Sequence, residues 1–132
     1  MDNGIETKKG RTIAHVTASA ITLALSLVAF ALFAYMAVEF FMSIPLQGSG
    51  ESISEQLGIG LTIGFSIVFM IIFGGAEIIV SVFAIPLHIS VVKYRDGGAR
   101  RYGIVALLTN SSIVIISIVT FIVVLIMNGA AS

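Results

Sequence analysis

Residues 93–102 read KYRDGGARRY, and this short polar stretch decides the fold because it separates two long apolar segments. It holds four of the seven basic residues, and the other three are Lys8, Lys9 and Arg11. Segments rich in lysine and arginine are retained on the cytoplasmic side of a membrane. Both basic stretches are therefore predicted to lie inside, which requires an even number of membrane crossings between them.

The composition indicates that lipid, not water, is the main solvent of this chain. Of its 132 residues, 58% are hydrophobic and 11% are charged, whereas soluble domains carry about 25% charged residues. A helix that spans a membrane needs about 20 mostly apolar residues. Three stretches are long enough, at about residues 12–44, 53–92 and 103–128. The sequence predicts an all-α integral membrane protein, with residues 1–132 forming a single membrane domain of three transmembrane helices.

The middle stretch is long enough to raise the question of two helices. Its 40 residues would reach about 60 Å as one helix, roughly twice the hydrocarbon core. Gly74-Gly75 is the one plausible break, but a turn there would leave backbone groups unpaired in lipid. Ser52 and Glu55 form a capping box that starts a single helix. The number of crossings between the two basic stretches must be even, and residues 12–44 supply one, so this stretch must supply one more. The N-terminus is then predicted inside and the C-terminus outside.

Small residues on the middle helix predict where helices pack. Gly60 and Gly64 form a GxxxG motif, and Gly74 follows ten residues later. Glycines allow close approach of helix backbones, which contributes strongly to helix association in lipid. We favour packing within the chain over a homodimer face for these glycines.

Glu77 is the most informative polar residue in the predicted spans. A carboxylate far from both ends of a span is costly and is by default a candidate for function. All lysines and arginines lie in the two basic stretches, so the sequence predicts a neutral, protonated Glu77 buried against protein. Two interpretations stay open with equal weight: a proton- or cation-binding carboxylate, and a structural hydrogen bond from the protonated acid to another helix.

His15, His88 and Asn110 all fall within a few turns of the predicted cytoplasmic boundary. A shared polar cluster is geometrically allowed, and interhelical hydrogen bonding is its favoured role. Two histidines without an acidic third ligand do not predict a metal site.

The sequence carries no enzyme signature. It has no P-loop, nucleophile elbow, HExxH or dinucleotide-binding motif, and the absence of cysteine excludes a cysteine nucleophile. We expect neither catalysis nor a cofactor. The zero net charge gives no indication of nucleic-acid binding.

Two functions are compatible with these features. The first is a small non-catalytic protein of the cell membrane that acts as a subunit, an assembly or regulatory factor, or an immunity-type partner. Besides the lipid bilayer, it would bind another membrane protein or a copy of itself. The alternative is a homo-oligomeric transporter or channel, linked to protons or cations through Glu77.

The predicted topology is testable by cysteine labelling. A cysteine placed at Ser49 or Ser132 should react with an impermeant reagent added outside intact cells, because both positions are predicted to be external. A cysteine at Gly98 should react only after the cells are opened. Labelling of Gly98 from outside would overturn the three-span topology.

Overall fold

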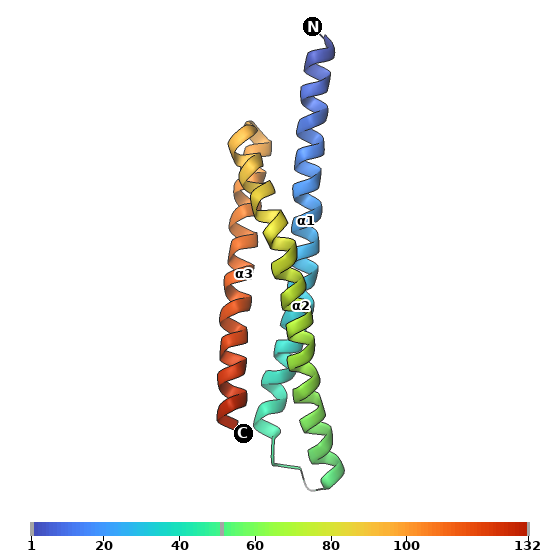
Figure 1. Cartoon of the computed structure of the whole chain (residues 1–132), viewed down its shortest axis with the longest axis vertical. Helices are drawn as coiled ribbons and strands as arrows, with labels where there is room; N and C mark the ends of the chain where they lie inside the picture. Colours follow the sequence, from blue (N-terminus) through green and yellow to red (C-terminus); the bar gives the residue numbers. More distant parts are fainter. Residues whose placement is uncertain (1, 51, 132) are drawn as a thin grey trace. The chain divides into compact units, whose positions relative to one another are not determined.

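The computed structural model describes residues 2–50 and 52–131, and the elements in this part of the chain are helical (Figure 1). In order they are α1 (Asp2–Ser43), the short 3-10 helix η1 (Ile44–Leu46), α2 (Ile53–Tyr94) and α3 (Gly97–Ala131). The described part contains three helices that are long and apolar enough to cross a membrane. The predicted all-helical fold with three candidate spans is confirmed at this level.

The helices extend beyond the apolar stretches from which they were predicted. α1 begins at Asp2, ten residues before the predicted span, and α3 begins at Gly97, six residues before it. Lysine, arginine and glutamate are good helix formers, so polar ends lengthen a helix without difficulty. α2 runs without interruption through Gly74-Gly75. The prediction of one long helix, in place of two shorter ones, is confirmed.

The helix ends are closed by local hydrogen bonds. The hydroxyl of Ser52 accepts a bond from the backbone N–H of Glu55 at 3.2 Å, as the capping box predicts. Between α2 and α3 only Arg95 and Asp96 are non-helical. Gly97 follows with a φ of 58°, in the left-handed region that glycine adopts without penalty. The result is a very short turn that makes α2 and α3 antiparallel neighbours.

The chain divides into two compact units, and each long helix contributes to both. The first unit comprises α1 up to Leu27, α2 from Glu77 and α3 up to Val114. The second unit comprises Val28–Ala76 and the chain from Ile115 onward.

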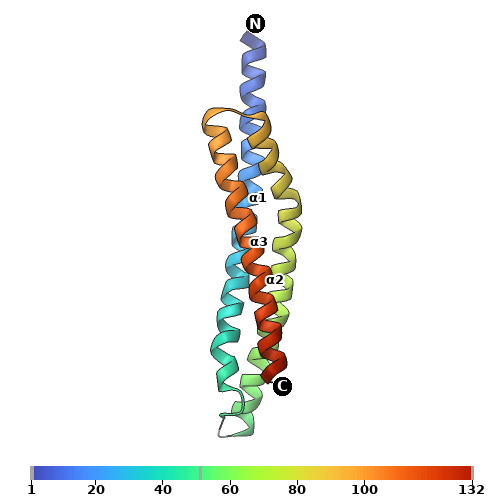
Figure 2. The ribbon, with the colours of Figure 1, turned by 90° about the vertical axis from the view of Figure 1, so that its left-hand side faces the viewer.

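In the first unit the three helical segments lie side by side (Figures 1 and 2). On α2 and α3 the buried positions recur at alternating steps of three and four residues, which is the spacing of helices packed in a bundle. On α2 these positions are Glu77, Ser81, Ala84, His88 and Val91, and on α3 they are Gly103, Ala106, Asn110 and Ile113.

Gly103 brings α3 close to α2 in the first unit. A Cβ atom at this position would lie 2.9 Å from Cγ1 of Val91 and 3.1 Å from Cγ2 of Val92. Real Cβ atoms essentially never come this close, so only glycine fits here without a shift of its neighbours. Close approach at glycine is the principal packing device available to helices in lipid. Gly103 was not among the glycines singled out from the sequence.

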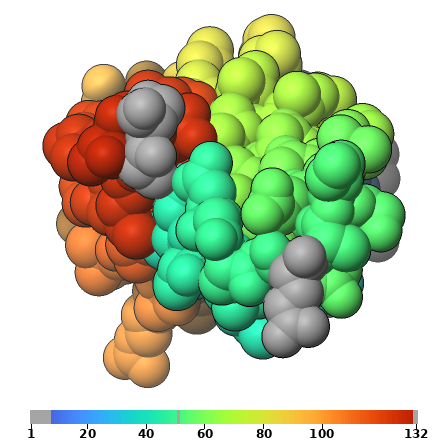
Figure 3. Space-filling view, turned by 90° about the horizontal axis from the view of Figure 1, so that it is seen from below, coloured from blue at the N-terminus to red at the C-terminus, as the bar shows by residue number. Residues whose placement is uncertain are grey.

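Figure 3 views the second unit from the end that carries the α1–α2 junction. The interior of this unit contains an apolar core. The core consists of Phe33, Ala37, Phe40, Ile44, Ile63, Met70 and Val124. Gly74 is buried there, and a Cβ atom on it would lie 3.2 Å from the ring of Phe33. Gly60 and Gly64 are exposed, and a Cβ atom on either would meet nothing within 4 Å. The expected contact within the chain therefore exists at Gly74 and not at the GxxxG pair, whose role in packing stays a prediction.

Leucine substitutions should distinguish the glycine in a helix contact, Gly103, from the exposed glycine at Gly64 by their effects on stability. Gly103→Leu should lower the free energy of unfolding by about 1–3 kcal/mol, because an added side chain in a packed contact forces its neighbours to move. Gly64→Leu is the matched control and should leave the isolated chain as stable as the wild type. Circular dichroism during titration of mild detergent with a denaturing one would measure both, and equal stabilities would contradict the assigned contact.

Candidate intramembrane polar site

The interior of the first unit contains a histidine, an asparagine, a glutamate and several serines. Each of its three helical segments contributes buried polar side chains, and none of these is more than 3% exposed. They are Ser19 and Ser26 from α1, Glu77, Ser81 and His88 from α2, and Asn110 from α3.

Asn110 joins all three segments. Its Nδ2 group donates to the Ser26 hydroxyl at 3.1 Å and to the Ser81 hydroxyl at 2.8 Å, while its Oδ1 lies 3.0 Å from Nε2 of His88. Ser26 and Ser81 also lie 3.3 Å from each other. An asparagine amide has two donor hydrogens, and both are used here.

The neighbours of His88 select one tautomer of its ring. Because the Nδ2 hydrogens of Asn110 are directed to the two serines, its Oδ1 faces His88 as an acceptor. Nε2 of His88 must therefore carry a hydrogen, and in a neutral ring Nδ1 is then an acceptor. The Ser19 hydroxyl lies 2.5 Å from Nδ1 and supplies the matching donor. The Tyr102 hydroxyl lies 3.4 Å from Ser19 and extends the network toward the α2–α3 turn.

Ser19, His88 and Asn110 have the same order of contacts as a nucleophile, a base and an orienting amide. Catalysis needs more than this order, because a substrate must reach the hydroxyl and an oxyanion must find donors. Ser19 and His88 are both 0% exposed. The backbone of Ser19 lies in the middle of α1, where N–H groups are bonded within the helix. The arrangement is suited to holding helices together.

Glu77 lies on the same face of α2 as Ser81 and His88, farther from the α2–α3 turn. It is 0% exposed and stands one helical turn from Ser81 and three turns from His88, about 16 Å along the axis. The cations of the chain all lie in residues 8–11 and 93–101.

His15 belongs to a different cluster at the turn end of the same unit. Arg95 donates from Nε to Nδ1 of His15 at 3.1 Å, from one terminal nitrogen to the Thr12 hydroxyl at 3.2 Å, and from the other to the backbone carbonyl of Arg11 at 3.4 Å. The guanidinium thus fastens the α2–α3 turn to α1. His88 and Asn110 are brought together by the fold, while His15 is held apart from them.

The sequence reasoning missed the serines that complete the network. Ser19 and Ser26 are seven residues apart on α1, and Ser81 and His88 are seven apart on α2. Residues seven apart lie on the same face of a helix in a bundle. This seven-residue spacing in the sequence could have indicated that the serines share an inward-facing side of their helices.

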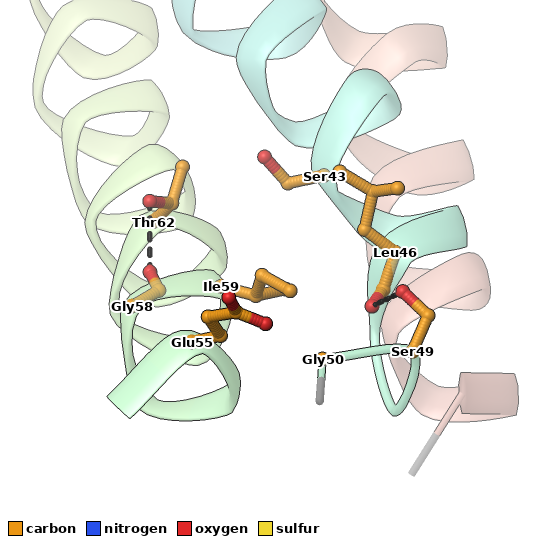
Figure 4. A pocket seen from close by; sticks show the side chains of 8 residues that line it. All are labelled: Ser43, Leu46, Ser49, Gly50, Glu55, Gly58, Ile59 and Thr62. Carbon is orange, nitrogen blue, oxygen red and sulfur yellow. Dashed lines mark hydrogen bonds between the residues drawn. The ribbon is translucent and has the colours of Figure 1, made fainter. Parts of the chain in front are cut away.

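A groove at the junction of α1 and α2 in the second unit offers no comparable chemistry (Figure 4). Among the described residues that line it, Glu55 carries the one ionisable side chain, and none is a histidine. Among the described residues, no group of three or more histidines and carboxylates is placed to hold a metal ion.

Comparison with known proteins gives this chain no relative. No family model, curated protein or solved structure matches it. Its function must therefore be argued from the geometry of its own residues.

Asn110→Ala should destabilise the protein by about 2 kcal/mol, because it removes three interhelical hydrogen bonds that are worth roughly 0.6 kcal/mol each in a membrane. Ser112→Ala, at an exposed position on the same helix, is the control and should change stability little. Unfolding in mixed detergents, followed by circular dichroism, measures both. A loss no larger than that of the control would show that the network contributes no stability.

Proposed function

We propose that this chain is a small, non-catalytic, multi-pass protein of the cell membrane that acts by binding another membrane protein through its helix faces. The observation that carries the proposal is the exposed Gly60 and Gly64 pair on α2, where an added Cβ atom would meet no neighbour within 4 Å among the described residues. Glycines spaced in this way allow a second helix to approach closely.

The polar interior of the first unit supports a non-catalytic role. Asn110, His88 and the serines around them are bonded to one another across three helical segments. Hydrogen bonds of this kind hold helices together in lipid. The surfaces available for function are then the outer faces of the helices and the short turns.

The proposed orientation, with the N-terminus inside, draws support from Arg95. Its bonds to His15, Thr12 and the carbonyl of Arg11 place the two basic stretches at the same end of the first unit. An even number of crossings between the stretches agrees with this arrangement, and basic segments are retained in the cytoplasm.

Site-specific photo-crosslinking in living cells tests the proposal. A photoreactive residue at Leu61, one turn from Gly64 on the same face of α2, should give a discrete crosslinked product, and Gly64→Leu should abolish it by blocking close approach. Phe69→Leu, at another exposed site on α2, should preserve the product. A product of twice the monomer mass would identify a second copy as the partner, and another mass a different protein. The absence of any product that depends on Gly64 would contradict the proposal.

The fully buried Glu77 favours a second function, proton- or cation-linked transport by an oligomer. Glu77 shares its face of α2 with Ser81 and His88, so titratable and hydrogen-bonding groups lie along one line inside the first unit. Purified protein in liposomes distinguishes the two functions. Proton or cation flux that is lost in a well-assembled Glu77→Gln variant would favour transport, because an amide does not titrate. No flux, with normal partner binding by the same variant, would favour the first function.

A further inference from the structure

A groove between α1 and α3 in the first unit takes no part in the proposed function. It lies at the end of the unit that carries the α2–α3 turn, and it has a volume of about 420 Å³, within the range of small-molecule sites. It is lined by Thr12, Ile13, Val16 and Thr17 from α1 and by Gly98, Ala99 and Tyr102 from α3.

The walls of the groove combine apolar surface with a polar margin. Ile13 is 57% exposed and lies one turn from Val16, so their side chains form an aliphatic strip along α1. Opposite them, Gly98 and Ala99 add little bulk, which leaves room between the helices. Tyr102 places a phenol ring at this level, as is common for tyrosine where a membrane meets water.

Cations lie one helical turn from lining residues on both helices. Lys8 and Lys9 precede Thr12 and Ile13 by one helical turn and therefore lie on the same side of α1. On α3, Arg101 follows Gly98 by about one helical turn and therefore lies on the same side of that helix. The two basic stretches, residues 8–11 and 93–102, contain seven cations and a single carboxylate, that of Asp96.

The guanidinium of Arg95 fixes one of these charges at the groove. It donates to the hydroxyl of Thr12, which is a lining residue, at 3.2 Å. The charge of Arg95 therefore lies at the polar margin and does not depend on a freely rotating side chain.

We propose that this groove binds one anionic phospholipid, with the phosphate among the cations of Lys9, Arg95 and Arg101 and the upper acyl chain along Ile13 and Val16. An interhelical groove at the membrane boundary is in contact with lipid, and basic pockets in this position suit acidic headgroups. The same end of a second copy would bring seven further cations and be repelled, so a phospholipid fits better than self-association. This site is separate from the Gly60–Gly64 face and does not depend on the proposed function.

Native mass spectrometry of the full-length chain in mild detergent tests the occupant. With dioleoyl phosphatidylglycerol and dioleoyl phosphatidylcholine supplied in equal amounts, one phosphatidylglycerol should be retained per chain in preference to phosphatidylcholine. Gly98→Leu should reduce that retention by filling the groove, since a Cβ atom there would meet no described residue beyond its own helix backbone and chain neighbours within 4 Å. Gly10→Leu is the matched control, because Gly10 is equally unobstructed and does not line the groove. Equal retention of the two lipids, or equal effects of the two variants, would overturn the proposal.

A second pair of variants separates the groove from general surface charge. Arg101→Gln should weaken phosphatidylglycerol binding about fivefold, the effect of one cation at a membrane surface. Lys93→Gln removes the same charge from α2, which contributes none of the lining residues, and should weaken binding much less. Circular dichroism would verify that each variant is folded. Equal losses in both variants would mean that diffuse attraction, and no built site, holds the lipid.

Discussion

The amide of Asn110 is the interaction on which the first unit depends. In lipid, a polar side chain without a protein partner has no water to bond with, so it must find its partners in neighbouring helices. Asn110 reaches α1 through Ser26 and α2 through Ser81 and His88, from a single position on α3. Apolar side chains supply no comparable preference for one helix over lipid. The network therefore sets which faces of the three segments turn inward.

Close packing and hydrogen bonding reinforce each other in this unit. Gly103 lets α3 approach α2 at Val91, one turn from His88. That approach places the Asn110 side chain, two turns further along α3, within 3.0 Å of the histidine ring. A larger residue at Gly103 would separate the helices and lengthen the bond. The second unit packs around an apolar core of rings and aliphatic side chains.

Sequence reasoning reached the coarse fold because length and hydropathy determine how many helices can cross a bilayer. It also predicted that α2 is continuous, because no polar loop interrupts this stretch. The cap at Ser52 was predicted as well. It did not identify Ser19, Ser81 or Gly103. Serine and glycine are frequent in membrane helices, and their role depends on how each helix is rotated about its axis, which hydropathy does not encode. The seven-residue repeat carried that information for the serines. For Gly103, only the position of Val91 reveals the contact.

The two-residue turn between α2 and α3 has a consequence for biogenesis. Helices joined by Arg95 and Asp96 alone are too closely tethered to enter the bilayer as independent segments. They would leave the insertion machinery as a hairpin, with His88 and Asn110 already within bonding distance. The desolvation cost of each polar side chain would then be reduced before the pair meets the hydrocarbon. In such a hairpin, the His88–Asn110 bond would connect α2 and α3 before either helix meets α1.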